Sequence, residues 1–167
     1  MEIIKGIYSR RSVRNFTDAP VSREDLLKIM ESGTWAPSGL NNQPWRFVLV
    51  QNETMRLRLS ALTKYRQIIE TASACIAVFL DHKVMYHETK DHQSIGACLQ
   101  NMLLAAHGLE LGAVWLGEIL NRAEEVSSLL NVGSEMELMA VVAVGHPADR
   151  GHAPSRLPLA DVLIGEF

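Results

Sequence analysis

Three arginines and a serine near the N-terminus have the types and spacing that suit anion binding. Arg10, Arg11, Ser12 and Arg14 lie within five positions of one another. A guanidinium keeps its charge at ordinary pH and donates paired hydrogen bonds to a phosphate. The segment therefore predicts a compact oxyanion cradle. A solvated helix face or a weak nucleic-acid arm would use the same residues, although nucleic-acid binders usually spread a larger basic excess over a whole domain.

A polar loop bracketed by two prolines is the second segment with possible chemistry. It runs over residues 36–45, with Pro37 and Pro44 restricting the backbone at its two ends. Between them, polar side chains can be presented at defined positions to a heteroaromatic ligand. Those side chains are Ser38, Asn41 and Gln43. Taken alone, such a loop is also typical of a simple turn.

Several common catalytic motifs are absent from the sequence. It contains no GxGxxG dinucleotide turn, no GxxxxGK[ST] P-loop and no GxSxG nucleophile elbow. His87 and His92 lie five positions apart, whereas the two histidines of a zinc-binding helix lie four apart. The extra residue turns the second imidazole off the first one's face, so we expect no metal site.

The composition is that of an ordinary globular chain with an uneven charge. Of its 167 residues, 47% are hydrophobic and the formal net charge is −3, which predicts one domain over residues 1–167. The first 16 residues carry +3, so the remainder carries −6. Residues 146–167, rich in proline and glycine at their start, are expected to form an extended C-terminal tail.

Cysteine usage and hydropathy predict a cytoplasmic protein that does not cross a membrane. Cys75 and Cys98 lie in apolar segments without a CxxC pair, as in reduced proteins. The longest apolar runs are seven residues, against the roughly 20 that a membrane helix requires. The N-terminus also lacks the apolar stretch of a signal peptide. We expect neither membrane nor nucleic acid as a partner.

Hydrophobic periodicity predicts the elements that must position these segments. Ser22 begins a capping-box pattern, and apolar residues then recur at helical spacing until Gly33. The remaining pattern predicts strands over residues 46–50, 74–80, 113–116 and 138–144, with helices after Asn52, over 91–111, and over 122–130 with Asn121 as the cap. Helices and strands alternate without successive long parallel crossovers, which favours an α+β fold and leaves a doubly wound sheet as the alternative.

The predicted helix over residues 91–111 is apolar on nearly its whole circumference. Such a helix should be buried on all sides. In a chain of this size a partner subunit would provide the missing cover, and the alternative is the central core helix of a monomer.

Several segments, taken together and in this order, resemble the nitroreductase-like flavoprotein family. Residues 10–16 match its RRSxRxF pattern and residues 36–45 match APSxxNxQPW. QNMLLAA at 100–106, GLELG at 108–112 and WLGE at 115–118 look like its central helix and following strand. GHP at 145–147 and RLPL at 156–159 resemble its C-terminal extension. The resemblance covers essentially the whole chain.

The resemblance implies an α+β fold with a mixed or antiparallel sheet of four to five strands flanked by helices. It also implies an intertwined homodimer that holds FMN non-covalently at the dimer interface. It carries cofactor contacts to Arg10, Arg11, Ser12, Arg14, Pro37, Ser38, Gly39, Asn41, Gln43, Leu116, Gly117, Glu118 and Arg156. Among these, Arg10, Ser12 and Arg156 match phosphate contacts, and Arg11 is expected to assist them.

The other matched positions are expected around the flavin ring. Arg14 matches a cation near the pyrimidine edge, where it would stabilise the negative charge of the reduced flavin. A loop that reaches the flavin from the partner chain is matched by Pro37, Ser38, Gly39 and Asn41. Gly117 and Glu118 match a segment whose backbone amides approach N5 and O4, with Leu116 packed beside the ring.

The chemistry that the resemblance implies is ping-pong hydride transfer. NADH or NADPH passes hydride to flavin N5, and an oxidised acceptor such as a nitroaromatic, a quinone or an activated alkene then takes the electrons. No side chain need act as acid, base or nucleophile, because the flavin carries the chemistry. Two other functions stay open: a specialised member such as a reductive dehalogenase or a flavin-consuming enzyme, and a non-catalytic FMN carrier or redox module.

The sequence departs from larger members of that family in its middle. Only residues 81–90 separate a predicted strand from the long helix, where larger members insert a helical excursion over the substrate. The acceptor side is therefore expected to be open, or completed by small local elements such as Tyr86 and His87. The sequence has no convincing match to the mid-chain Asn and Lys flavin contacts of some larger members, and Lys64 is only a stand-in for them.

Overall fold

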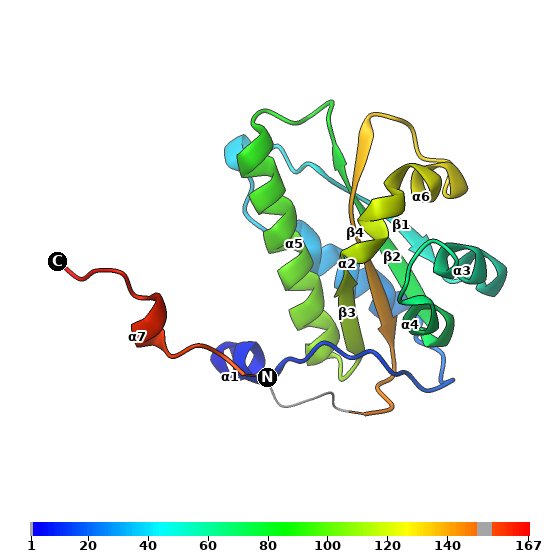
Figure 1. Ribbon diagram of the computed structural model, residues 1–167, viewed down its shortest axis with the longest axis horizontal. Coiled ribbons are helices and arrows are strands. Elements are labelled where there is room, and N and C mark those ends of the chain that lie inside the picture. The colour runs from blue at the N-terminus through cyan, green and yellow to red at the C-terminus, as the bar shows by residue number, and fades with distance from the viewer. Residues whose placement is uncertain (1, 150–154) are drawn as a thin grey trace.

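The computed structural model describes residues 2–149 and 155–167 and shows a four-stranded sheet between two layers of helices (Figure 1). The strands are β1 (Trp45–Val50), β2 (Ala74–Asp81), β3 (Gly112–Leu116) and β4 (Met136–Gly145). Their order is β1-β2-β4-β3, and each neighbouring pair is antiparallel. The prediction of an α+β fold with an antiparallel sheet is confirmed.

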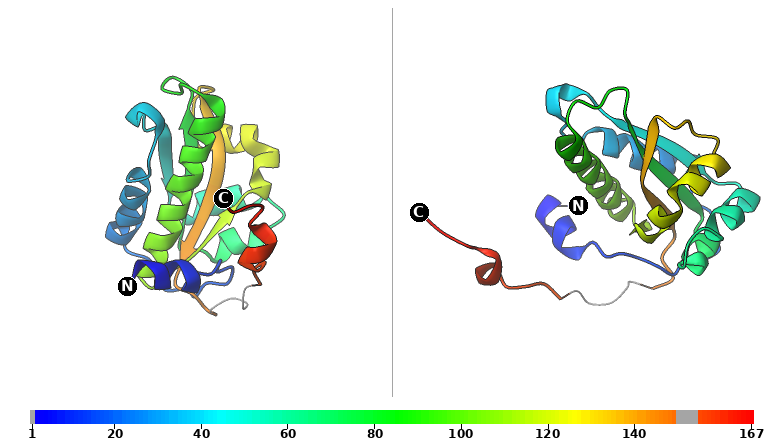
Figure 2. Two further views of the ribbon diagram at one scale, coloured as in Figure 1. Left: turned by 90° about the vertical axis from the view of Figure 1, so that its left-hand side faces the viewer. Right: turned by 45° about the horizontal axis from the view of Figure 1, so that its top comes forward.

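Helices cover both faces of this sheet. The helices of the described residues are α1 (Ile3–Ser9), α2 (Arg23–Thr34), η1 (Gly39–Asn41), α3 (Glu53–Ser60), α4 (Arg66–Thr71), α5 (Glu88–Gly108), η2 (Glu118–Arg122), α6 (Ala123–Leu129) and α7 (Leu159–Val162). Helices α2 and α5 pack on one face, while α3, α4 and α6 lie on the other, as Figures 1 and 2 show.

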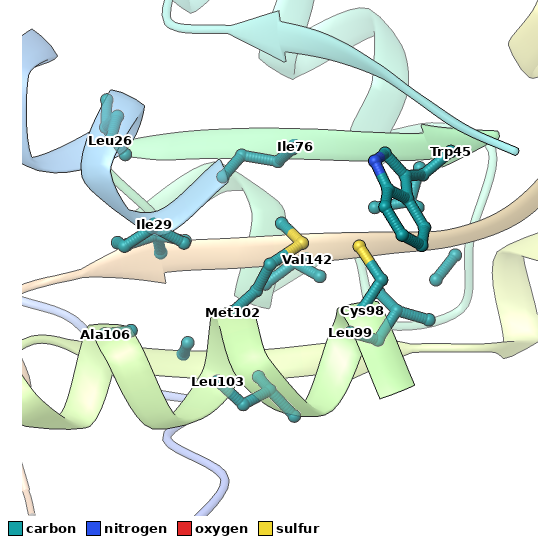
Figure 3. Packing of buried hydrophobic residues seen from close by; sticks show 14 of the residues in the cluster. Leu26, Ile29, Trp45, Ile76, Cys98, Leu99, Met102, Leu103, Ala106 and Val142 are labelled. Atoms are coloured by element: carbon teal, nitrogen blue, oxygen red, sulfur yellow. The ribbon is translucent and has the colours of Figure 1, made fainter. Parts of the chain in front are cut away.

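Alternation along the central strands divides the core into two clusters. Ile76 and Val78 of β2 face α2 and α5, whereas the intervening Ala77 faces the layer of α3, α4 and α6. This is the period of two expected of a strand with a helical layer on each face. Figure 3 shows the first cluster, in which Met102 of α5 and Ile29 of α2 meet over the sheet.

The ends of the two longer helices have identifiable causes. The Ser22 hydroxyl accepts a hydrogen bond from the Asp25 amide at 3.0 Å, so the predicted cap of α2 is confirmed. Helix α5 begins at Glu88, three residues before the predicted start, because the Asp91 carboxylate accepts from backbone amides just ahead of the helix. It ends at Gly108, because Glu110 adopts a left-handed turn with φ of 61°.

The predicted helix over residues 122–130 was placed correctly but its cap was wrong. The side chain of Asn121 donates to the Glu118 carbonyl at 2.9 Å inside the 3₁₀ turn η2, and α6 starts only at Ala123. The short helices α1 and α7 were not predicted. Helix α7 lies within the segment expected to be an extended tail, part of which falls outside the described residues.

One side of α5 and the C-terminal segment have little cover from this chain. Gln93 and Gln100 of α5 are exposed, so the chain's own residues do not bury this helix on all sides. Helix α7 stands clear of the rest of the chain in the right-hand view of Figure 2, and none of its residues is buried. The apolar side chains exposed along this segment are Leu157, Leu159, Val162, Leu163, Ile164 and Phe167. Among the described helices, none combines the length and apolar character that a bilayer crossing demands.

Candidate functional site

The N-terminal segment is held along the β3 side of the sheet. Ser12 forms a parallel bridge with Ala113, and the Val13 amide donates to the Ala113 carbonyl at 3.1 Å. A Cβ on Gly112 would lie 2.7 Å from Val13 Cγ1, so the glycine permits this close approach. Just upstream, Ser9 Oγ lies 2.8 Å from Nε2 of His107 in the last turn of α5. The arginines are thereby fixed at the C-terminal end of α5.

Arg10 has buried hydrogen-bond donors that nothing in the described chain satisfies. Its Nε and Nη1 atoms are buried without a partner. Burial lowers the pKa of Arg10, and the neighbouring charges of Arg156 and Arg11 lower it further. Within residues 2–149 and 155–167, none of these three cations is paired with a carboxylate. Buried donors without partners and repulsion between like charges both cost free energy, and a bound anion would remove both costs.

The remaining basic side chains near Arg10 differ in what they can offer. Arg11 Nη1 donates to the carbonyls of Tyr8 and Arg10, both at 2.7 Å. Arg11 therefore adds positive charge, but one nitrogen of its guanidinium is already hydrogen-bonded. Arg14 is exposed and makes one long contact, 3.4 Å to the Ser12 carbonyl. Burial and the charges of Arg10 and Arg11 lower the pKa of His107.

The proline-bracketed loop lies at the opposite end of α5. The turn η1 within it contacts the start of α5, seen at the top of that helix in Figure 1. Leu40, Asn41 and Gln43 all have positive φ, at 54°, 55° and 48°. Ser38 Oγ accepts from the Gln43 amide at 3.1 Å. Such strain in residues other than glycine persists only where the surroundings fix the backbone.

The arginine cluster and this loop do not meet within one chain. His107 contacts the segment that holds the cluster, through Ser9, and Asp91 contacts the loop, through Asn42. Both residues belong to helix α5. Sixteen residues separate them, which at 1.5 Å per residue is about 24 Å. Within one chain the arginine cluster and the loop therefore lie apart, one at each end of α5.

The end of β3 supplies a third group of predicted residues. Leu116 is buried, and a Cβ on Gly117 would meet no atom within 4 Å, so the space above Gly117 is open. The Glu118 carboxylate is occupied: it accepts from Thr63 Oγ1 at 2.7 Å and from the Lys64 amide at 3.0 Å. These hydrogen bonds lower the pKa of Glu118, and the bond from Thr63 has the largest effect.

Sequence reasoning missed two polar residues that hold the loop in place. Asn42 Nδ2 donates to Asp91 Oδ1 at 2.7 Å and to the Val84 carbonyl at 3.0 Å. Asp91 is fully buried. An acidic residue in the first turn of a helix was the available signal, since it is typical of a capping role. The pairing with Asn42, 49 positions away, left no trace in local spacing.

The histidine pair considered for metal binding is split between two environments. His92 Nδ1 lies 2.6 Å from the Glu88 carbonyl and its Nε2 lies 3.3 Å from Glu137. His87 precedes α5 as its N-cap residue. Across the part of the chain that the structure describes, no three His, Cys, Asp or Glu side chains are grouped so as to hold a metal ion.

Fold and site together define an α+β protein with a central antiparallel sheet and an unpaired cationic cluster beside its long helix. A sequence model of the Nitroreductase family matches residues 7–75 and 58–146. The chain is also 37% identical, over 89% of its length and 87% of the relative's, to a candidate NADH dehydrogenase/NAD(P)H nitroreductase of Archaeoglobus fulgidus. The chain belongs to the Nitroreductase family, as its sequence predicts.

Solved structures agree with this assignment. A candidate nitroreductase from Desulfovibrio desulfuricans, crystallised in complex with FMN, is 47% identical with a TM-score of 0.95, covering 100% of this chain and 98% of that one. The NADPH:FMN oxidoreductase of Vibrio harveyi, complexed with NAD⁺, is 26% identical with a TM-score of 0.87, covering 98% of this chain and 76% of that one. The fold of those proteins is therefore the fold of this chain.

Proposed function

We propose that the chain is an FMN-dependent NAD(P)H oxidoreductase that works as a homodimer. The observation that carries this proposal is the pair of buried, unpartnered donors on Arg10, set beside the cations of Arg11 and Arg156. A dianionic phosphate such as that of FMN would satisfy these donors through charge-assisted hydrogen bonds and would offset the neighbouring positive charges. The D. desulfuricans structure with FMN and the NAD(P)H-dependent relatives support the choice of ligand.

The N-terminal cradle would hold the phosphate end of FMN. Arg10 provides Nε and Nη1, Ser12 a hydroxyl, and Arg156 a second guanidinium from the C-terminal segment. Arg11 would add positive charge near Arg10. The exposed Arg14 would place its cation at the pyrimidine edge of the ring, where a fixed positive charge favours the reduced, anionic form.

The end of β3 would support the ring. The open space above Gly117 leaves its backbone accessible, and the buried Leu116 provides an apolar wall. Because the carboxylate of Glu118 is already engaged by Thr63, Glu118 would contribute through its backbone amide. Lys64 forms a long ion pair with Glu118, with Nζ 4.0 Å from the carboxylate, and its exposed side chain would approach a ligand from that side.

The second half of each site would come from the partner chain. Ser38, Gly39 and Asn41, with Pro37 and Gln43 at the ends of the loop, lie too far along α5 to reach the cradle of their own chain. A two-fold dimer that buries the open side of α5 would bring each loop to the other chain's cradle. The exposed apolar side chains of the C-terminal segment support such an assembly.

The chemistry that FMN supplies when bound is ping-pong hydride transfer from NADH or NADPH through N5 to a nitroaromatic, quinone or similar oxidised acceptor. The residues of the chain would bind and orient the cofactor. The connection from β2 to α5 is short, and the backbone above Gly117 is open, which favours a broad range of planar acceptors.

Anaerobic titration of the purified, FMN-loaded dimer tests this proposal. NADH or NADPH should bleach the flavin absorbance, and a quinone or nitroaromatic should restore it. Failure of both nucleotides to bleach the flavin would contradict an oxidoreductase and favour an FMN carrier. A monomer that binds FMN as tightly as a dimer would contradict the shared site.

A further inference from the structure

Asp91 connects two segments that are far apart in sequence. One oxygen of its carboxylate accepts from the backbone amides of Tyr86 and His87, both at 2.9 Å. The other oxygen accepts from Asn42 Nδ2 at 2.7 Å. Burial raises the pKa of Asp91, but these three hydrogen bonds outweigh it, so the pKa lies below its usual range and the carboxylate is ionised. A buried carboxylate with this many donors is a rigid junction.

The orientation of Asn42 is set by this junction. Its Nδ2 donates both to Asp91 and to the Val84 carbonyl, while its Oδ1 is buried without a partner among the described residues. A flipped amide would place Oδ1 against two acceptors, so the observed orientation is the only one that bonds. Asn42 thus gives up one hydrogen bond to fix the strained loop over residues 38–43.

Tyr86 packs on the same loop. A Cβ on Gly39 would collide with the ring and hydroxyl of Tyr86, so the tyrosine lies directly against the Gly39 backbone. Lys90 Nζ lies 5.5 Å from the centre of that ring. The loop and the corner at Tyr86 therefore form one block, and Asp91 is the buried group that bonds to both parts.

We propose that Asp91, acting through Asn42, is the positioning residue of the half-site that each chain presents to its partner's flavin. This inference rests on the proposed function, in which the loop over residues 38–43 contacts the ring. Loss of the junction should let the strained loop relax away from its ligand-facing conformation. The arginine cradle, about 24 Å away along α5, should be unaffected.

The two half-sites can be separated by comparing FMN with riboflavin, which lacks the phosphate. Asn42→Ala and Asp91→Asn should each raise the dissociation constants of FMN and riboflavin by the same factor, roughly tenfold, as expected for loss of an ordering contact. Arg10→Ala should weaken FMN alone. Ser94→Ala is the matched control, because it removes a buried hydroxyl on α5 whose one hydrogen bond to a described residue is to the Lys90 carbonyl, at 3.0 Å.

A double-mutant cycle tests whether Asp91 acts through Asn42. The double variant Asn42→Ala/Asp91→Asn should bind riboflavin within about twofold of the weaker single variant, because both changes break one junction. Effects that multiply to roughly a hundredfold would overturn the inference. Asn42→Ala keeps the two backbone bonds of Asp91, so it remains informative if Asp91→Asn does not fold.

The outcomes also distinguish this inference from the proposed function. If NAD(P)H bleaches the wild-type flavin and Arg10→Ala weakens FMN, but Asn42→Ala and Asp91→Asn bind both flavins like wild type, the positioning role is refuted while the function stands. A loss confined to FMN would likewise refute it, since the effect would then lie at the phosphate. Wild-type protein that binds neither flavin would refute the function itself.

Discussion

Replacing Arg10 tests whether this arginine binds a ligand or stabilises the fold, because the two roles predict opposite effects on the thermal stability of the FMN-free protein. In the free protein, Arg10 Nε and Nη1 bond to no described atom, and Arg11 and Arg156 repel the side chain. Arg10→Ala should therefore leave the melting temperature of the FMN-free protein unchanged or raise it. With FMN present, the same change removes a charge-assisted contact that contributes roughly 1.5–3 kcal/mol.

That loss corresponds to an increase of about 10- to 150-fold in the FMN dissociation constant, at about 1.4 kcal/mol per tenfold. Isothermal titration calorimetry measures it directly. A thermal melt gives a second measure, because a ligand stabilises the folded state by RT ln(1 + [L]/Kd), so the FMN-induced rise in Tm should shrink in the variant.

Arg56 provides the matched control, since it is an arginine with a structural role. Its Nη1 donates to the carbonyls of Ile69, Glu70 and Ala72 at the end of α4. Arg56→Ala should lower Tm with and without FMN and leave the FMN dissociation constant unchanged. If Arg10→Ala instead destabilised the FMN-free protein and bound FMN like wild type, the phosphate would lie elsewhere.

Three further predictions concern packing, capping and pH. Gly33→Ala should destabilise the protein by about 1–3 kcal/mol in urea unfolding, because the new methyl would lie 2.8 Å from Met102 Cγ where α2 crosses α5; an unchanged midpoint would show that the helices separate freely. Ser22→Ala should cost about 1 kcal/mol by removing the α2 cap, whereas Ser22→Thr, which keeps a hydroxyl to accept from the Asp25 amide and donate to its carboxylate, should keep most of that stability. The Glu88 carbonyl and then Glu137 raise the pKa of His92, so its contribution is fully present below the unfolded pKa and is lost as pH rises through the higher folded pKa. Urea midpoints of wild type and His92→Gln should therefore differ at pH 5.5 and converge by pH 8.5, and an equal difference at both values would contradict this.

Local sequence was sufficient where a feature depends on neighbours along the chain. The cap at Ser22 needs only Asp25, and each strand of the sheet was found because its alternating or continuous apolar pattern is local. The cap assigned to Asn121 failed for a related reason. The residue type suits a cap, but the preceding 3₁₀ turn drew its side chain back to Glu118, and a turn of that kind has no distinct pattern.

The candidate site residues also fall into two groups, those that could be predicted from neighbouring residues and those that depend on contacts distant in sequence. The basic cluster was visible because its charge is concentrated in a few adjacent positions. Arg156, far away in sequence, was named only through the family resemblance, and in the structure its charge acts on Arg10. The junction at Asp91 could not be predicted from the sequence, because it depends on the contact between Asn42 and Asp91, and neither residue type is unusual at its position. Only the packing of the loop on the start of α5 brings them together.

The short connection between β2 and α5 changes how the acceptor side should be understood. It spans only the residues between Asp81 and Glu88, and Asp91 folds its end back onto the chain's own loop through Tyr86. It therefore does not extend outward as a cover. Instead it supports the loop over residues 38–43 from behind, so that a rigid and strained loop is held without a large insertion. Under the proposed function, the single buried carboxylate of Asp91 would preorganise the loop that faces the flavin ring, while the short connection would leave the acceptor side open.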